Sequence, residues 1–152
     1  MPIRVIAGTV ENVTGPVREV AIQPQYLDVS VPPHTVFTHP IPRGHTAFAY
    51  VFSGKGVFCR QNDPFTYDSE SSSYFDQQRD RLVGDRHLVQ FGDGDAMTVV
   101  TEGDAVRFLL VSGQPLGEPI AWRGPIVMNT QAELRLAFEE LDTNTFIKHK
   151  AR

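Results

Sequence analysis

The stretch HPIPRGHTAFAYVFSGKG, residues 39–56, joins a turn, a strand and a chain reversal. Within it, alternate residues of an extended chain point to opposite sides, so Phe48, Tyr50 and Phe52 share one face and smaller residues share the other. The two glycines of SGKG then predict a tight turn. We predict that this strand belongs to a β-sheet protein and that its aromatic face packs in the core. The alternative is an aromatic stripe that lines a ligand cavity.

The same period-two alternation recurs along the chain. In QYLDVSV, residues 25–31, Leu27, Val29 and Val31 share one face. Further candidate strands are IRVIA (3–7), VREVAI (17–22), HLVQF (87–91), AMTVVT (96–101) and VRFLLVS (106–112). Glycine-containing turns separate many of them, and the chain has 12 Gly and 11 Pro, which are residues typical of turns. About eight short strands with such turns predict an all-β antiparallel sandwich or barrel.

One segment interrupts this rhythm with polar, Ser-rich and charged sequence, residues 60–86. Loops of this length are uncommon and are usually either functional or disordered. We favour a solvated insertion between two strands, with a lid over the barrel mouth as the alternative. The lid would be held by the aromatic residues of the segment, which are Phe65, Tyr67, Tyr74 and Phe75.

A second segment, residues 130–141, has the pattern of a helix. Thr130 and Glu133 form a capping box, in which each side chain satisfies a free backbone N–H at the start of the helix. An apolar stripe at helical spacing follows, made of Leu134, Ala137, Phe138 and Leu141. We predict one C-terminal helix whose stripe docks on a sheet. Because no linker or internal repeat is evident, residues 1–152 are predicted to form a single domain.

The composition indicates a folded protein and argues against several kinds of partner. Hydrophobic residues make up 41% and charged residues 21% of the chain. With a net charge of -4 and no Lys/Arg-rich face, nucleic-acid binding is disfavoured. No apolar run is long enough to span a membrane, and the N-terminus does not match a signal peptide. The single Cys59 fits a reducing compartment, so we predict a cytoplasmic protein.

The histidines do not form the pattern of a metal site. A mononuclear iron centre needs three or four converging ligands, and a β-strand supplies two of them most simply as His-x-His. None of the five histidines is two residues from another. A site assembled by folding from His39, His45 and His87 is the remaining alternative. We instead interpret His39 as a turn residue and the other two as strand-edge residues, and we predict no metal and no cofactor.

Other chemistry-bearing residues have simpler structural interpretations. Asp93 and Asp95 lie in the turn GDGDAM and are predicted to be solvated rather than an acid–base pair. Cys59 follows the apolar GVF and is predicted to be a buried, inert thiol rather than a nucleophile. Trp122 is interpreted as a packing residue. The sequence therefore predicts no catalytic, cofactor-binding or metal-binding residue.

Four stretches carry a resemblance to a known family. FLLVSGQPLGEPIAWRGPIVMNTQAELRLAFEEL, residues 108–141, resembles the end of the C-terminal half of a pirin. IRVIAG, YLDVSVPP and PIPRGHTAFAYVFSG resemble successive earlier stretches of the same half. The resemblance covers nearly all of the chain outside 60–86. It implies a cupin, a double-stranded β-helix or jelly-roll barrel, with one C-terminal helix.

The resemblance also implies where a metal would be held. Pirins resemble a pair of cupins, of which the first binds iron through His-x-His and a later His-x-Glu, while the second is generally metal-free. Against the motif HPHRG of a first barrel, this chain has Pro40, Ile41 and Pro42 in place of HPH. Proline offers no side-chain donor atom. No functional residue of the family therefore carries over to this chain.

Two functions follow from this resemblance. The first is a non-catalytic module that acts by association, either as a homodimer or with a separate metal-binding cupin half. The second is a metal-dependent dioxygenase of the quercetinase type, or half of a split one. A barrel that binds a small-molecule ligand under the 60–86 segment lies between them.

Overall fold

The computed structural model describes residues 1–59 and 81–148. The chain forms two compact units, Met1–Pro115 and Leu116–Arg152. The first unit is built of β-strands and the second combines a β-hairpin with a helix. Along the described ranges, no helix is long and apolar enough to cross a membrane.

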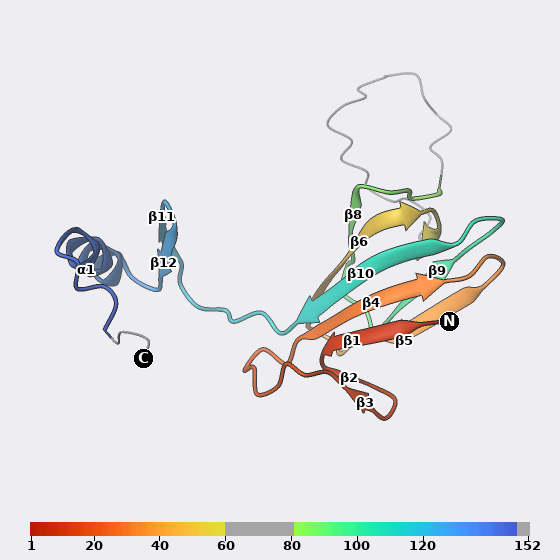
Figure 1. Cartoon of the computed structure of the whole chain (residues 1–152), viewed down its shortest axis with the longest axis horizontal. Helices are drawn as coiled ribbons and strands as arrows, with labels where there is room; N and C mark the ends of the chain where they lie inside the picture. The colour runs from red at the N-terminus through yellow and green to blue at the C-terminus, as the bar shows by residue number, and fades with distance from the viewer. Residues whose placement is uncertain (60–80, 149–152) are drawn as a thin grey trace, which may run out of the picture. The chain divides into compact units, whose positions relative to one another are not determined.

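The larger sheet of the first unit has five antiparallel strands in the order β1-β4-β10-β6-β8 (Figure 1). These strands are β1 (Ile3–Ala7), β4 (Gln25–Val31), β10 (Val106–Gly113), β6 (Thr46–Gly54) and β8 (His87–Gln90). The long central pairing of β6 with β10 brings together strands that are far apart in the sequence. The smaller sheet has the order β5-β9-β7 and contains β5 (Val36–Pro40), β9 (Ala96–Val100) and β7 (Val57–Phe58). A short hairpin of β2 (Thr9–Val10) and β3 (Val13–Thr14) follows β1.

The hydrophobic core lies between the two sheets. Phe108 of β10 is fully buried and contacts Phe58 edge-to-face at a ring-centroid distance of 5.1 Å. It also contacts Phe37, at 6.4 Å. Because Phe37 and Phe58 belong to the smaller sheet, these three rings join the two sheets through the core. The predicted alternation of β4 is confirmed, because the face shared by Leu27, Val29 and Val31 is fully buried. The predicted all-β architecture is likewise confirmed.

The turn after β6 depends on a glycine. Gly54 has a φ of +75°, and a Cβ at this position would lie 1.9 Å from the carbonyl oxygen of Ala105. A side chain is therefore excluded both by the backbone conformation and by the neighbouring backbone. This close approach lets the amide of Lys55 donate to the same carbonyl, at 3.3 Å. The turn predicted from SGKG is thus confirmed.

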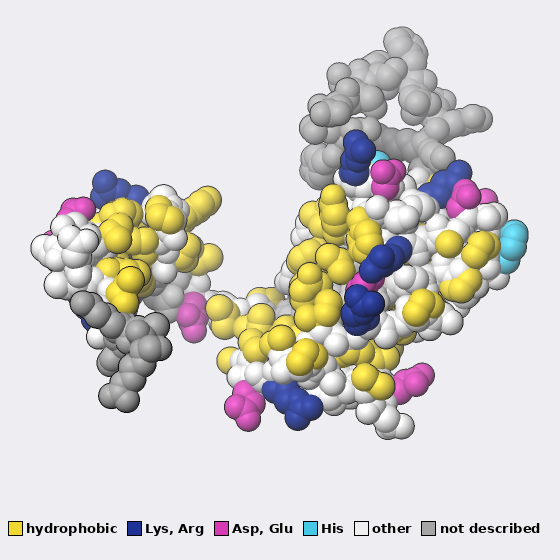
Figure 2. All heavy atoms as spheres, in the orientation of Figure 1, with side chains coloured by type: hydrophobic (Ala, Val, Ile, Leu, Met, Phe, Trp, Pro, Cys, Tyr) yellow, Lys and Arg dark blue, Asp and Glu magenta, His cyan; other side chains and the backbone are white. Residues whose placement is uncertain are grey.

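The aromatic face of β6 lies on the outside of the barrel. Ala47, Ala49 and Val51 are buried, whereas Phe48, Tyr50 and Phe52 are 36%, 40% and 37% exposed. Hydrophobic side chains accordingly gather on the outer surface over β6 and β10 (Figure 2). The prediction that the aromatic face packs in the core was wrong, and so was the alternative that it lines an internal cavity. The interior beside β6 is occupied by side chains from the other sheet, and only small residues of β6 fit against them.

The second unit has a small core of its own. A hairpin of β11 (Ala121–Arg123) and β12 (Ile126–Met128) packs against α1 (Gln131–Asp142). Its buried residues are Ala121, Ile126, Leu134 and Ala137, with Met128 and Phe138 packed alongside. The predicted capping box is present, because Thr130 accepts from the amide of Glu133 while the Glu133 carboxylate accepts from the amide of Thr130. Leu141 is 46% exposed, so the predicted apolar stripe ends before it.

Several local predictions need correction. VREVAI, residues 17–22, is not a strand, since only Val17 forms an isolated bridge, to Ala7. Left-handed backbone at Glu19 and Gln23 prevents an extended course there. Strand β5 and the hairpin β11–β12 were not predicted at all. Of the predicted 60–86 insertion, residues 60–80 lie outside the described residues, and so does the lid interpretation that rests on their aromatic side chains.

A candidate site at one end of the barrel interior

A polar cluster lies inside the barrel where the two sheets meet. His39 of β5 is 4% exposed, and its Nε2 lies 3.0 Å from Oε1 of Gln25 on β4. The hydroxyl of Ser112 on β10 donates to the same oxygen, at 3.4 Å. The imidazole N–H and the hydroxyl therefore share one acceptor, which satisfies polar groups that are largely removed from water. The hydrogen bond from His39 to Gln25 also links the smaller sheet to the larger one across the interior.

Strand register places this cluster at one end of the barrel. Gln25 lies opposite Ser112 on β10, and Ser112 lies opposite Ala47 on β6. The next inward positions along these strands are apolar, with Leu27 opposite Leu110. On β4 and β10 the inward side chains are therefore polar in the first row, at Gln25 and Ser112, and apolar in the rows that follow.

The environment of His39 favours a neutral ring. Burial lowers the pKa of the His39 imidazole from its ordinary value of 6.5. Its hydrogen-bond partner is an uncharged amide, and its ring stacks on Phe37 at a centroid distance of 6.1 Å. A neutral histidine that donates to an amide fixes side chains in place. It lacks the carboxylate partner that usually orients a histidine for proton transfer.

The three histidines considered for a metal site are in different environments. His39 is a buried strand residue, so its interpretation as a turn residue was wrong. His45 immediately precedes β6 and is half-buried, and its buried Nδ1 has no hydrogen-bond partner among the residues that the structure describes. His87 opens β8 at the edge of the larger sheet, where it is exposed, and its Nδ1 contacts the carbonyl oxygen of Asp85 at 3.0 Å. His87 pairs with Val51, four residues beyond Ala47, or about 13 Å further along the sheet from the polar cluster.

The donor set of this site does not fit an iron centre. Over residues 1–59 and 81–148, no group of three or more His, Cys, Asp or Glu side chains is placed to hold one ion. Alternation along β5 and the residue after it places Phe37, His39 and Ile41 inside the barrel, where all three are buried. The residues between them therefore face outward. Pro40 and Pro42, which match the ligands by resemblance, are both exposed. One imidazole, an amide and a hydroxyl provide fewer strong donors than such a centre uses.

Sequence reasoning missed Gln25 and Ser112, although a signal was present. Both are polar residues in phase with a buried face, Gln25 with Leu27 on β4 and Ser112 with Leu110 on β10. A polar side chain on the inward face of a strand needs a partner across the core. That requirement could have directed attention to His39 on the opposite sheet.

Structural contacts are evident for three of the remaining candidate residues, which are Asp93, Asp95 and Cys59. The packing role predicted for Trp122 is not. Asp95 is exposed and pairs with Arg43 at 3.0 Å, and Asp93 accepts from the amide of Gly44 at 3.3 Å, as expected for turn carboxylates. Cys59 is half-buried rather than buried, and its Sγ accepts from the amide of Thr98 at 3.5 Å. Trp122 is 73% exposed, so the packing role predicted for it is not fulfilled within the second unit.

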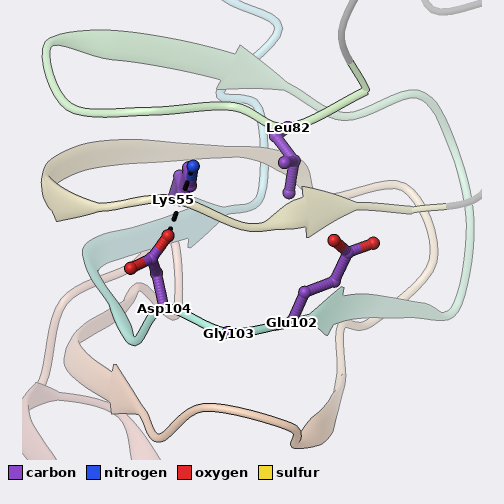
Figure 3. Close-up of a pocket in the computed structure, with 5 residues that line it drawn as sticks. All are labelled: Lys55, Leu82, Glu102, Gly103 and Asp104. Carbon is purple, nitrogen blue, oxygen red and sulfur yellow. Dashed lines mark ion pairs between the residues drawn. The ribbon is translucent and has the colours of Figure 1, made fainter.

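Two of the surface hollows formed by the described residues lie outside the barrel interior. The first, of about 80 Å³, is lined by Lys55, Leu82, Glu102, Gly103 and Asp104. In Figure 3 the Lys55 ammonium points to Asp104, at 3.2 Å, while the Glu102 carboxylate points to the Leu82 side. The second, of about 390 Å³, lies on the outer face of the smaller sheet over Val36, Val57, Cys59, Thr98 and Val100. Neither brings together an acid, a base and a nucleophile.

Comparisons with known proteins agree with the barrel architecture. Residues 26–147 match the model of the Pirin C-terminal cupin domain. The chain is 34% identical to Pirin-1 of Arabidopsis thaliana over 91% of this chain and 43% of that protein. It is 32% identical to a putative quercetin 2,3-dioxygenase of Thermoplasma acidophilum over 97% of this chain and 52% of that protein. The chain therefore spans about half the length of the curated relatives it matches.

A solved structure confirms the predicted barrel type. A quercetin 2,3-dioxygenase from Acinetobacter baumannii superimposes with a TM-score of 0.72 at 26% identity. The superposition covers 95% of this chain and 43% of that one. The predicted cupin fold with one C-terminal helix is thereby confirmed.

Proposed function

Since this chain belongs to the pirin family, as a C-terminal cupin domain, we propose that it acts by association with another polypeptide and performs no metal chemistry in its own barrel. The observation that carries the proposal is the chemistry of the polar cluster. His39 is the buried imidazole of the cluster, and its N–H is already committed to Gln25.

The barrel interior supports a structural role for this cluster. Inward positions on the strands next to His39, Gln25 and Ser112 carry hydrocarbon side chains that pack against one another. A bound substrate would need space beside the reacting groups. Here the row that follows the cluster is already filled by Leu27 and Leu110, both fully buried.

The two-barrel organisation that the resemblance implies supports association between cupins. Similar proteins are about twice as long as this chain, and the resemblance implies a second, metal-binding barrel in them. As the partner of this cupin we propose either a separate metal-binding cupin half or a second copy of the chain.

The names of two similar proteins favour a second candidate function. The relative from Thermoplasma acidophilum is a putative quercetin 2,3-dioxygenase, and the superimposed structure from Acinetobacter baumannii carries the same activity in its name. This chain would then be the metal-free half of a dioxygenase made of two polypeptides. The metal and the substrate would lie in the other half.

Metal content tests the proposal directly. We would produce the full chain without an affinity tag, in medium supplemented with iron, nickel and copper, and determine its metal content by elemental analysis. The expected result is far less than one metal ion per chain and no oxygen uptake with quercetin. If oxygen uptake appears when a metal-binding cupin is added, this result would support the second candidate function.

Near-stoichiometric metal that is lost on changing His39 or His45 to alanine would overturn the proposal. His34→Ala is the matched control, because His34 is exposed in the loop before β5. A metal that is lost equally in this control would indicate binding at the surface rather than in the barrel, and would leave the proposal standing.

A further inference from the structure

The outer face of the larger sheet carries a continuous apolar patch. Strand register aligns Tyr26, Val111 and Phe48 in one row across β4, β10 and β6. In the next row, Leu109, Tyr50 and Leu88 are neighbours across β10, β6 and β8. Phe52 extends the patch along β6. We call these seven residues the outer patch: Tyr26, Phe48, Tyr50, Phe52, Leu88, Leu109 and Val111.

Paired charges border the outer patch on one side. Arg107 of β10 donates from Nε and Nη2 to the two carboxylate oxygens of Asp28 on β4, at 2.9 and 2.6 Å. Arg4 of β1 lies opposite Asp28 in the register. The Arg107 guanidinium also lies over the ring of Phe52, 4.8 Å from its centroid. Figure 2 shows dark-blue Lys and Arg side chains beside the hydrophobic surface of the first unit.

The outer patch is large enough to contribute to a specific interface. Its five most exposed members are between 36% and 62% exposed, and Leu109 and Val111 are half-buried. Taking about 200 Å² for a whole large side chain gives roughly 400 Å² of apolar surface per copy. A contiguous patch of this size usually marks an association site. Two such patches and their borders together reach the size of about 1,000 Å² at which specific interfaces begin.

We propose that the outer patch is the interface of a homodimer, in which the larger sheets of two copies pack face to face. This inference rests on the proposed function, because it names the partner and the surface of the association. Sheets pack in this way about 10 Å apart when both inner faces are apolar. A two-fold axis near Tyr50 sets the aromatic rows of one copy against those of the other and leaves the Arg107–Asp28 pairs at the border, in contact with water.

The charges on this face favour a second copy as the occupant. Arg107 and Asp28 neutralise each other, which leaves the single positive charge of Arg4 on this border, too little to select a strongly acidic or basic partner. The apolar centre is free of charged side chains, as in the core of a protein interface. A nucleic acid or an anionic membrane surface would need an excess of Lys and Arg, whereas the chain has a net charge of -4.

The oligomeric state of the full chain tests the inference. Sedimentation velocity and light scattering would be measured from sub-micromolar to high micromolar concentration, for wild type, Tyr50→Arg, Leu88→Arg and Val36→Arg. Wild type is expected to be a dimer. Tyr50→Arg places a charge at the centre of the interface and is expected to raise the dissociation constant at least tenfold. Val36 is 68% exposed on the opposite sheet, so Val36→Arg is the matched control and is expected to leave the dimer intact.

A cross-linking experiment locates the interface independently of dimer strength. In a Cys59→Ser background, which removes the single native cysteine, Tyr50→Cys is expected to give a covalent dimer with a short bismaleimide. Val36→Cys in the same background is expected to remain uncrosslinked. Circular dichroism would confirm that each variant folds. If Tyr50→Arg does not fold, Leu88→Arg provides the same test, because Leu88 is 62% exposed on an edge strand.

Two results would overturn this inference. One is a wild-type chain that stays monomeric at every concentration, and the other is a dimer that survives both arginine substitutions in the outer patch. Neither result decides the proposed function, because the metal-content experiment tests that function separately. A monomer whose outer patch binds a separate cupin half would retain the proposed function and reject the homodimer.

Discussion

The two faces of β6 are opposite in character to what side-chain size alone suggests. The inward face carries Ala47, Ala49 and Val51, all buried, and the outward face carries three aromatic rings. The small residues are inside because rings from the other strands, Phe37, Phe58 and Phe108, already fill the space between the sheets. The large residues are outside, where they contribute less to the core than their size would allow. This difference indicates that the inner face of β6 maintains the fold, whereas its outer face is the one on which we propose that a second copy packs.

The largest effect should come from removing a ring that joins the two sheets. Phe108→Ala deletes a fully buried side chain that contacts Phe37 and Phe58, and is expected to lower the free energy of unfolding by about 3–5 kcal/mol. Tyr50→Ala removes a ring of similar size from the outer face and should cost within about 1 kcal/mol. Urea denaturation measures both. It should be done at low protein concentration, where dimerisation contributes little to apparent stability.

Equal losses in the two variants would show that the outer ring is as well packed as the inner one. The comparison between the two faces of β6 would then no longer hold. A larger loss for Tyr50→Ala at high protein concentration alone would instead measure the contribution of the interface.

The next effect tests whether the inner face of β6 has room for a larger residue. Ala49 is fully buried, so Ala49→Phe forces a ring into filled space and should cost at least about 1–3 kcal/mol. Thermal unfolding would measure the change, with Gln90→Phe as the control, because Gln90 is exposed on the neighbouring strand. A neutral Ala49→Phe would contradict the close packing of the two sheets and reveal an internal cavity beside β6.

The sequence predicted which residues share a face more reliably than which face is buried. On β4 one face is aliphatic and the other contains Asp28, so alternation also identified the inner side. On β6 both faces are apolar, so the period of two does not indicate which face is buried. Packing against the sheet across the core decides this. The helix was predicted with its cap because the interaction of Thr130 with Glu133 is local in sequence.

The polar cluster escaped prediction because it depends on contacts between distant segments. His39 lies between residues that read as a turn, with Pro40 directly after it. Yet Pro40 ends β5, an edge strand of the smaller sheet, where a missing N–H is tolerated. The pairing of His39 with Gln25 spans 14 residues and crosses from one sheet to the other. The inward phase of Gln25 indicates that this residue needs a polar partner, but the register of both sheets is required to identify His39 as that partner.

A double-mutant cycle on the cluster should give a smaller, asymmetric effect. Gln25→Leu leaves His39, which is 4% exposed, without its acceptor and should cost about 1–3 kcal/mol. His39→Leu should cost less, because Gln25 is only half-buried and can reach water. The double variant should be closer to wild type than Gln25→Leu, since the buried imidazole is then gone and only the Ser112 hydroxyl has lost its acceptor. Thr38→Val on the outer face of the smaller sheet, whose hydroxyl contacts that of Thr98 at 3.1 Å, is the control. Additive losses would contradict the hydrogen bond inferred inside the barrel.

The smallest effect concerns the charged border of the outer patch, and it depends on pH. The hydrogen bonds from Arg107 lower the pKa of Asp28 below its ordinary value of 3.8, although partial burial of the carboxyl opposes them. The folded state therefore binds the Asp28 proton less readily than the unfolded chain does. The resulting stabilisation is complete above pH 3.8 and is lost as the pH falls through the lower pKa of the folded state.

Arg107→Met should remove this contribution, so that its free energy of unfolding lies below that of wild type at neutral pH and approaches it at the acidic end of a titration. Chemical denaturation between pH 6 and pH 2.5, at about 0.1 M salt, would follow the difference. Lys55→Met is the matched control, because Lys55 and Asp104 are at least half exposed and their pair should contribute little. A difference between Arg107→Met and wild type that stays constant through the acid range would assign the effect to lost packing of Arg107 on Phe52 rather than to its charge.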